Sequence, residues 1–231
     1  MFHVKHLKGV LLMKIAVAYG HSPNCIGAVG YMNEVRKMME LAPYLIKHLR
    51  NAGHTVLEIK STEKTENKDL TYRVKKANDW KADLYIDLHM NSFNKTAKGF
   101  EVLIYDSRHK DVVQKANAIC ENFKKLGFVN RGIKHRPDLY VLRNTTMKAI
   151  LPEIGFCDNK SDCDLINKLG LDKIALNIAN GIDPKIKEKK TETRYLVEVR
   201  GMTDPKRQQL IIDFLKANKF NYKAEEYEVE I

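Results

Sequence analysis

Residues 14–22 read KIAVAYGHS, in which an apolar run, Ile15–Tyr19, ends at a glycine that is followed by His21. A short apolar run bounded by a turn residue is typical of a strand buried on both faces of a sheet. A second run of this kind, Leu84–Leu88, is followed directly by His89. Because ligands of an open α/β sheet bind at the carboxyl ends of its strands, we expect both histidines at one edge of one sheet.

Strands and helices are predicted to alternate along the chain around these two runs. Residues 55–59 and 100–105 are also typical of strands, and further short apolar runs lie at residues 139–142 and 149–154. Apolar side chains recur at helical spacing over other segments, namely residues 35–49, 70–81, 112–126 and 165–178. This alternation predicts an α/β fold with a largely parallel sheet.

The C-terminal part of the chain is predicted to form a separate small unit. Residues 183–193 are rich in Pro and Lys, and we interpret them as a linker between a main domain, residues 13–182, and residues 194–231. The latter read as a β-α-β unit, because apolar residues alternate before and after a predicted helix at 210–215. A unit of this size is marginal alone, so we expect it to pack on the main domain or to pair with a second copy of itself as a homodimer. A separate hypothesis is that it targets the protein to a surface.

Composition and charge narrow the function classes. The chain has 231 residues, of which 44% are hydrophobic and 30% charged, as in soluble globular proteins. We expect no transmembrane segment, because Lys14 interrupts the longest apolar run well short of roughly 20 residues. The net charge is +11, and the excess lies in residues 1–190, since residues 191–231 hold nearly equal numbers of acidic and basic side chains.

A basic domain of this kind is attracted to polyanions, which include nucleic acids, membrane surfaces and acidic cell-wall polymers. No nucleic-acid-binding motif is recognisable, and aromatic residues are not interleaved with basic runs, so we expect no nucleic-acid partner. The alternative to a polyanion partner is a solvated lysine-rich surface.

The N-terminus superficially resembles a signal peptide, with early positive charge before an apolar stretch. Lys14 breaks that stretch, and cleavage near Ala18 would remove the first predicted strand, so we expect no export signal and a cytoplasmic location. Met1 and Met13 both remain possible starts of the protein. The four cysteines form no CxxC pair, and we expect them to be reduced.

Four side chains with metal and proton chemistry are placed to meet at the predicted sheet edge. His21 and His89 follow two strands, Glu34 begins a predicted helix, and Glu153 lies inside an apolar run. A catalytic zinc ion takes three nitrogen or oxygen ligands and keeps one position open for water. His21, Glu34 and His89 would supply those ligands, and Glu153, costly to bury unless it is used, would take a proton from the water.

Simpler interpretations of these residues remain open. A histidine is more often a surface or packed residue than a ligand, and Glu34 could simply stabilise its helix by interacting with the helix dipole. Cys25, four residues after His21, is an alternative ligand. Asp87 shares a strand face with His89 and would either orient its imidazole or, as we favour, face solvent at the strand end. Pro152 removes a ladder donor and predicts a bulge or an edge position for its strand.

The ordered motifs resemble those of the zinc-dependent N-acetylmuramoyl-L-alanine amidases, and most closely the phage endolysin amidases of Gram-positive hosts. They are Gly20-His21-Ser22, Asn33-Glu34, the stretch Leu88-His89-Met90-Asn91-Ser92, and Glu153-Ile-Gly-Phe156 with Asp158-Asn159 after it, and the likeness covers residues 13–182 in order. Four motifs at compatible spacings are more specific than any one of them.

The resemblance implies a twisted, mainly parallel sheet flanked by helices and one Zn²⁺ ion. It makes His21, Glu34 and His89 the ligands, Glu153 the catalytic carboxylate, and Asn91 and Ser92 candidates for substrate binding. The implied reaction is hydrolysis of the amide between the lactyl group of muramic acid and L-alanine in peptidoglycan. The implied setting is a phage endolysin that waits in the cytoplasm before it reaches the cell wall and its anionic polymers. The alternatives are a bacterial autolysin or sporulation amidase, a muropeptide carboxypeptidase, and a non-enzymatic polyanion-binding protein.

Overall fold

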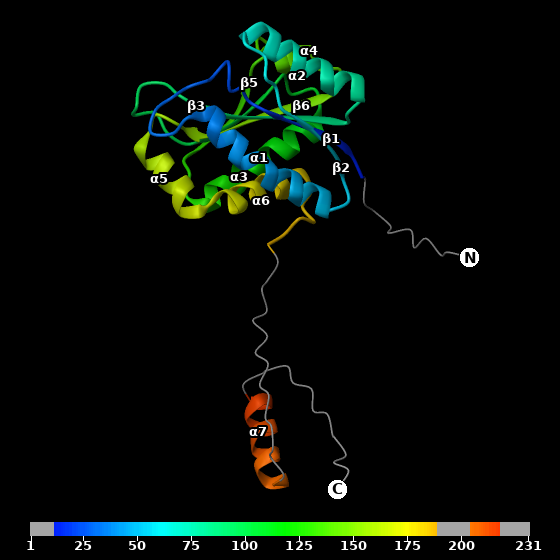
Figure 1. The fold of residues 1–231 in the computed structure, drawn as a ribbon, viewed down its shortest axis with the longest axis vertical. Coiled ribbons are helices and arrows are strands. Elements are labelled where there is room, and N and C mark those ends of the chain that lie inside the picture. Colours follow the sequence, from blue (N-terminus) through cyan, green and yellow to red (C-terminus); the bar gives the residue numbers. More distant parts are fainter. Residues whose placement is uncertain (1–11, 189–203, 218–231) are drawn as a thin grey trace, which may run out of the picture. The chain divides into compact units, whose positions relative to one another are not determined.

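The computed structural model describes residues 12–188 and 204–217. The chain divides into two units between Glu188 and Lys189, and each is described by itself. In the described part of the first unit, six strands form one sheet in the order β2-β1-β3-β6-β4-β5 (Figure 1). Their bounds are β1 Lys14–Tyr19, β2 Thr55–Ile59, β3 Leu84–Asn91, β4 Phe100–Ile104, β5 Asn130–His135 and β6 Lys148–Phe156.

The sheet is mainly parallel, as the sequence predicts. Strand β1 pairs in parallel with β2 and β3, and β3 pairs in parallel with β6. Strand β4 is inserted antiparallel beside β6, and β5 pairs in parallel with β4. The carboxyl ends of β1, β3 and β6 therefore meet the amino ends of β4 and β5 at one edge of the sheet.

Helices cover both faces of the sheet (Figure 1). The larger hydrophobic core lies between one face of the sheet and four helices, α1 Glu34–Asn51, α3 Lys110–Leu126, α5 Lys160–Leu169 and α6 Leu171–Ile182. The other face packs against α2 Glu66–Trp80 and the short α4 Tyr140–Asn144. Strands buried on both faces in this way read as continuous apolar runs, which explains why β1 is recognisable from sequence.

Several helix and strand boundaries differ from the sequence-based prediction. Helix α2 begins at Glu66 rather than Leu70, because a polar first turn hides its start from apolar periodicity. The helix predicted at residues 165–178 is two helices, α5 and α6, separated at Gly170, whose φ of +78° breaks the helical backbone. Of the run at 139–142, Leu139 is the N-cap of helix α4 and residues 140–142 lie in that helix, and strand β5 was missed because its sequence, NRGIKH, is mostly polar.

Pro152 marks an irregular strand, as predicted, but not an edge strand. Strand β6 lies between β3 and β4. Its register with β3 shifts between the pairs His89–Glu153 and Asn91–Phe156, so one extra residue is accommodated in β6. Gly155, with φ of +132°, lies within this bulge. Glu153 precedes the bulge, and the regular parallel register of β6 with β3 places it beside His89 near the edge where the strands end.

The second unit is described only over α7 Pro205–Ala217, which contains the helix predicted at 210–215. The two strands predicted around that helix lie outside the described residues, as do residues 189–193 of the predicted linker. In the two described stretches, no helix combines the length and apolar character needed to cross a bilayer.

Gly181 provides a test of the helical layer, because α6 and α3 approach closely there. A Cβ atom at Gly181 would lie 2.3 Å from Ile119 Cγ1 and 2.9 Å from the Ile119 backbone nitrogen. We expect Gly181→Ala to lower the free energy of unfolding by about 1–3 kcal/mol, since overpacking forces the helices apart. Denaturant unfolding measures this free energy. The control is Lys173→Ala, on the exposed side of α6, which should change the free energy of unfolding by less than about 0.5 kcal/mol. Equal stabilities of the two variants would contradict the packing described.

Candidate functional site

The end of β1 is pressed against the end of β3, and this contact positions His21. The Gly20 backbone N–H donates to the Leu88 carbonyl at 2.8 Å. A Cβ atom at Gly20 would lie 2.3 Å from that carbonyl oxygen and 2.7 Å from the His89 ring, so only glycine fits. His21 itself has φ of +66°, a left-handed conformation that few non-glycine residues adopt. Such backbone strain is typical of functional sites.

Glu34 is held in place by backbone donors from two other segments. It is the first residue of α1, directly after the N-cap Asn33, whose side chain accepts from the Arg36 backbone nitrogen. Its Oε2 accepts from the Ala28 backbone N–H at 2.9 Å, and its Oε1 accepts from the Met90 N–H at 3.0 Å. The residue is 3% exposed. The carboxylate therefore sits buried at a fixed position between β1, β3 and the helix start.

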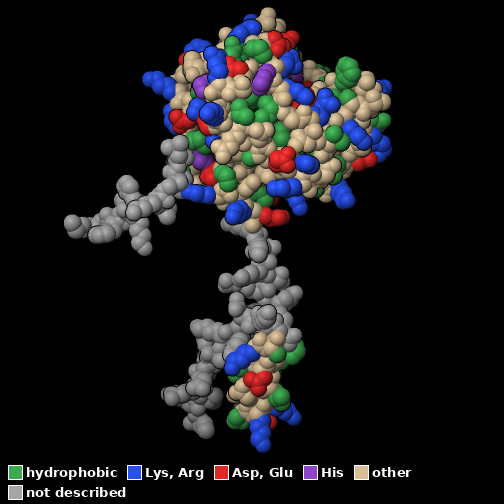
Figure 2. All heavy atoms as spheres, turned by 180° about the vertical axis from the view of Figure 1, so that it is seen from behind, with side chains coloured by type: hydrophobic (Ala, Val, Ile, Leu, Met, Phe, Trp, Pro, Cys, Tyr) green, Lys and Arg blue, Asp and Glu red, His purple; other side chains and the backbone are tan. Residues whose placement is uncertain are grey.

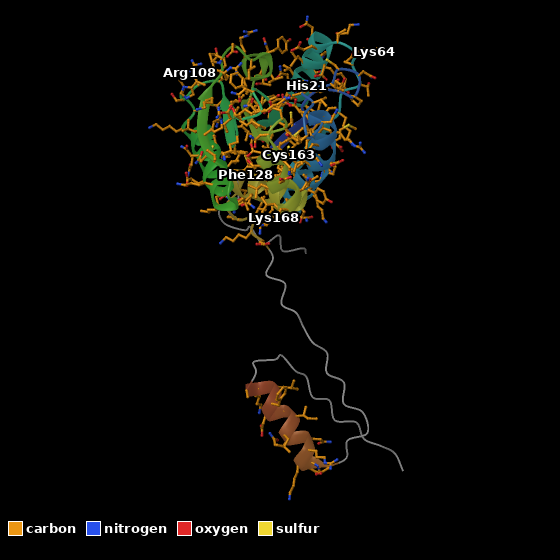
Figure 3. The ribbon with its side chains drawn as sticks, turned by 90° about the vertical axis from the view of Figure 1, so that its left-hand side faces the viewer. His21, Lys64, Arg108, Phe128, Cys163 and Lys168 are labelled. Atoms are coloured by element: carbon orange, nitrogen blue, oxygen red, sulfur yellow. The ribbon has the colours of Figure 1, made fainter. Side chains whose placement is uncertain are left out.

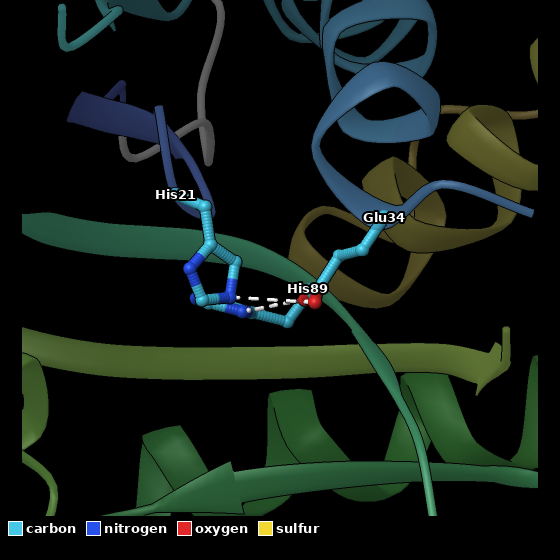
Figure 4. A group of neighbouring side chains, drawn as sticks. All are labelled: His21, Glu34 and His89. Carbon is cyan, nitrogen blue, oxygen red and sulfur yellow. Dashed lines mark hydrogen bonds and ion pairs between the residues drawn. The ribbon is translucent and has the colours of Figure 1, made fainter. Parts of the chain in front are cut away.

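The structure brings His21, Glu34 and His89 together (Figure 4). His21 Nε2 lies 3.3 Å from Glu34 Oε2, and His89 Nδ1 lies 2.9 Å from Glu34 Oε1. One ligand atom from each residue lies within 4.8 Å of the other two. Figure 3 views the unit from the sheet edge where His21 lies. Two imidazole nitrogens and one carboxylate at this spacing fit the three protein ligands of a catalytic zinc ion, whose fourth position is taken by water or substrate.

The pKa values of Glu34 and His89 depend strongly on the charges of their neighbours. Burial would raise the pKa of Glu34, but hydrogen bonds with His21 and His89 lower it well below its usual range. Burial would lower the pKa of His89, but the neighbouring Asp87 and Glu34 raise it to about 10. Glu34 is therefore ionised at neutral pH, and His89 carries a proton until another cation replaces it. Metal binding at such a group releases a proton and weakens in acid.

Glu153 lies beside this group without belonging to it. It is the register partner of His89 on β3 and of Glu101 on β4. Its Oε2 is buried and has no hydrogen-bond partner among the described residues. Burial, together with the negative charges of Glu34 and Glu101, raises the pKa of Glu153 to about 8. A carboxyl group with a pKa near neutrality is suited to exchange protons.

Glu101 and Arg131 belong to the same edge and were missed by the sequence analysis. Glu101 is buried on β4, where it accepts from Arg131 Nε at 2.8 Å and from Asn91 Nδ2 at 2.7 Å. A carboxylate inside an apolar run was the signal used for Glu153, and Glu101 carries the same signal in FEVLI. Its relevance depends on β4 lying antiparallel beside β6, which periodicity does not predict.

The other predicted site residues have more limited placements. Asn91 ends β3, and both ends of its amide are engaged, since Nδ2 donates to Glu101 and Oδ1 accepts from the Ser92 backbone N–H at 2.9 Å. Ser92 is exposed at the start of the next loop. Cys25, the alternative ligand, is not part of the three-residue group, and all four cysteines are free thiols, as expected.

The favoured interpretation of Asp87 is wrong. Asp87 does not face solvent, because its exposed fraction is 0%. Its Oδ1 accepts from Arg73 Nη1 at 2.6 Å, and its Oδ2 lies 3.5 Å from His89 Nε2. Burial would raise the pKa of Asp87, but the Arg73 guanidinium and His89 hold that pKa below its usual range. The sequence could not reveal the burial of Asp87, because its partner Arg73 lies on helix α2 and the packing of α2 beside Asp87 is not visible from sequence.

Residues 15–184 match the profile of a known family, described as N-acetylmuramoyl-L-alanine amidase. The chain belongs to the N-acetylmuramoyl-L-alanine amidase family. The zinc-fitting group and Glu153 both lie inside the matched residues. Members of this family are zinc-dependent, in agreement with the donor set at the sheet edge.

Individual amidase relatives and structures cover most of the first unit. The sporulation-specific N-acetylmuramoyl-L-alanine amidase of Bacillus subtilis is 30% identical over 192 residues, which are 82% of this chain and 74% of that protein. An uncharacterized protein of Clostridium perfringens is 35% identical over 177 residues, 75% of this chain and 52% of that protein. The solved catalytic domain of CD27L endolysin, targeting Clostridia difficile, has a TM-score of 0.69 and 38% identity, and covers 74% of this chain and 96% of that domain.

The chain is shorter than some of these amidase-family relatives. It spans 52% and 59% of the length of two Clostridium perfringens proteins that it matches.

Gly27 tests how tightly the group is enclosed. A Cβ atom there would lie 2.2 Å from Glu34 Oε2 and 2.4 Å from His21 Nε2. We expect Gly27→Ala to lower zinc affinity at least about tenfold, because it displaces two of the three donors while the sheet core is untouched. Chelator competition measures the affinity, and thermal unfolding of the metal-free protein checks the fold. The neighbouring Ile26→Ala, at an exposed residue, is the control and should bind zinc as the wild type does. Wild-type affinity in Gly27→Ala would contradict the described enclosure.

Proposed function

We propose that this protein is a zinc-dependent N-acetylmuramoyl-L-alanine amidase that hydrolyses the bond between the lactyl group of muramic acid and the L-alanine of the peptidoglycan stem peptide. The observation that carries the proposal is the arrangement of Glu153 beside His21, Glu34 and His89 at one sheet edge. A group that fits a metal and a neighbouring carboxyl group of raised pKa are the two parts that metal-assisted hydrolysis of an amide uses.

His21, Glu34 and His89 are the proposed ligands. A zinc ion bound there would lower the pKa of water and polarise the scissile carbonyl. Glu34 supplies the single negative charge among the three proposed ligands, so a divalent ion held there would keep a net positive charge toward a developing oxyanion. The backbone N–H groups of Ala28 and Met90 keep the Glu34 carboxylate from turning away.

Glu153 is the proposed catalytic residue. Its unpartnered Oε2 is free to take a proton from the attacking water and then to give that proton to the leaving amine of L-alanine. Both steps are efficient when the carboxyl pKa lies near the working pH, and burial with two neighbouring carboxylates provides this. Asn91 is proposed to act through Glu101, to which its amide is bound, while Ser92 remains at the exposed edge where substrate would approach.

The biological setting we infer is lysis of a Gram-positive cell wall by a phage endolysin. The likeness to an endolysin catalytic domain supports this setting, and the sporulation-specific relative supports the alternative of a bacterial amidase with the same chemistry. Lys and Arg side chains are spread over the face that Figure 2 shows. This charge would hold the enzyme near anionic wall polymers, its proposed partners besides peptidoglycan. Homodimerisation or wall targeting through residues 194–231 stays a prediction.

Product analysis with Glu153→Gln tests the activity directly. On purified Gram-positive peptidoglycan, the wild type should produce new L-alanine amino termini without new reducing sugar ends. We expect Glu153→Gln to lower kcat roughly 10²–10⁴-fold while zinc content stays unchanged, because a proton carrier is lost but no ligand is. Release of a terminal amino acid instead would identify a carboxypeptidase, and undiminished turnover by the variant would remove Glu153 from the reaction.

Glu101→Gln tests the origin of the raised pKa of Glu153. The negative charge of Glu101 raises that pKa, so a neutral amide should lower it, and Arg131, freed from its ion pair, acts in the same direction. Glu153 must be ionised to accept a proton, so the acidic limb of the kcat/KM profile should move to lower pH, by roughly one unit. Glu40→Gln, on the exposed side of α1, is the control and should leave the limb in place. A limb that moves to higher pH would contradict this electrostatic account.

A further inference from the structure

A buried group of three charged side chains lies behind His89, and the proposed mechanism does not use it. Asp69 and Arg73 belong to helix α2, and Asp87 belongs to strand β3. Their exposed fractions are 2%, 1% and 0%. Burying charges at this depth is costly, and replacing such groups by apolar residues is often neutral or stabilising. Their presence directly beside the zinc-fitting group therefore calls for a reason other than stability.

The Arg73 guanidinium bridges the two carboxylates. Its Nε and Nη2 donate to Asp69 Oδ2 at 3.0 and 2.9 Å, and its Nη1 donates to Asp87 Oδ1 at 2.6 Å. Asp69 and Arg73 are four residues apart on one helix face, so the helix presents them together. Arg73 thus fixes the Asp87 carboxylate from one side, with its position set in turn by Asp69.

The other side of Asp87 faces His89. Residues 87 and 89 are two apart on β3 and share a face of the sheet. Asp87 Oδ2 lies 3.5 Å from His89 Nε2, whereas the opposite ring nitrogen, Nδ1, lies 2.9 Å from Glu34 Oε1. One nitrogen of the ring therefore faces a buried carboxylate, and the other faces the zinc-fitting group. An imidazole that donates its Nε2 proton to Asp87 keeps the Nδ1 lone pair for a metal ion.

We propose that Asp87, held by Arg73, is a positioning residue that fixes the tautomer and ring orientation of His89 for zinc binding. The proposal rests on the zinc site proposed above but not on the identity of the substrate. It assigns the buried charges a task, since Arg73 Nη1 donates to both oxygens of Asp87 and so holds the ionised carboxylate with Oδ2 toward His89.

The chain offers a matched pair of variants. Asp69 and Asp87 flank the same guanidinium, so Asp87→Asn and Asp69→Asn each leave one buried, balanced ion pair with Arg73. Only Asp87 approaches His89. In Asp87→Asn the amide oxygen is drawn to Arg73, so the amide NH₂ faces His89 Nε2, which must then accept. This places the ring proton on Nδ1, where zinc has to bind.

Zinc affinity, measured by chelator competition at fixed pH, is the main readout. We expect Asp87→Asn to lower it roughly 10–100-fold and Asp69→Asn to change it less than about threefold. Asp87→Ala, which removes the acceptor without imposing the wrong tautomer, should lie between the wild type and Asp87→Asn. A merely structural role predicts instead that alanine, which leaves a cavity, is at least as harmful as asparagine. Thermal unfolding of each metal-free variant reports whether it folds.

The outcomes separate this inference from the proposed function. A wild type that binds no zinc overturns the proposed function. A wild type that binds zinc, with Asp87→Asn binding it equally well, overturns only the positioning role. Equal losses in Asp69→Asn and Asp87→Asn also overturn it, because they would show that the buried network acts through general packing. The order wild type, Asp87→Ala, Asp87→Asn in falling affinity supports it.

Discussion

The buried carboxylate of Glu34 is the constraint on which the rest of the site depends. An ionised side chain that is 3% exposed must be compensated by hydrogen bonds and opposite charge. Backbone N–H groups of Ala28 and Met90 provide hydrogen bonds, and His89, whose pKa is raised, provides the opposite charge. These partners come from the loop after β1 and from the end of β3. Satisfying one carboxylate therefore brings together the helix start, the loop and both strand ends.

The close approach of β1 and β3 makes this arrangement sterically possible. Gly20 lets the two strand ends touch, and Gly27 lets the following loop lie directly over His21 and Glu34. Neither glycine contributes chemistry of its own. Each removes a side chain where donor atoms must converge within a few ångströms. The regular register of β6 with β3 sets Glu153 level with His89, and the bulge of β6 follows this pair.

Much of this could be predicted from sequence because it depends on local signals. The apolar run before His21, the run before His89 and the N-cap Asn33 before Glu34 each place one side chain at a strand or helix end. The rule that parallel strands end at one edge then joins them. Residues whose roles depend on which elements pack together were not accessible. Glu101 lies beside Glu153 because β4 runs antiparallel to β6, and the buried Asp87 is neutralised by Arg73 of helix α2.

The distribution of charge determines which kind of ion this edge of the sheet favours. The protein as a whole is basic, with a net charge of +11, yet the interior around His89 holds carboxylates from Glu34, Asp87, Glu101 and Glu153. Arg73 and Arg131 neutralise two of these groups, and the proton on His89 offsets part of the remainder. A divalent cation at the three donors would replace that proton with a larger positive charge. The fold thus creates a local deficit of positive charge inside a basic domain, and a metal ion relieves that deficit, whereas a polyanion would increase it.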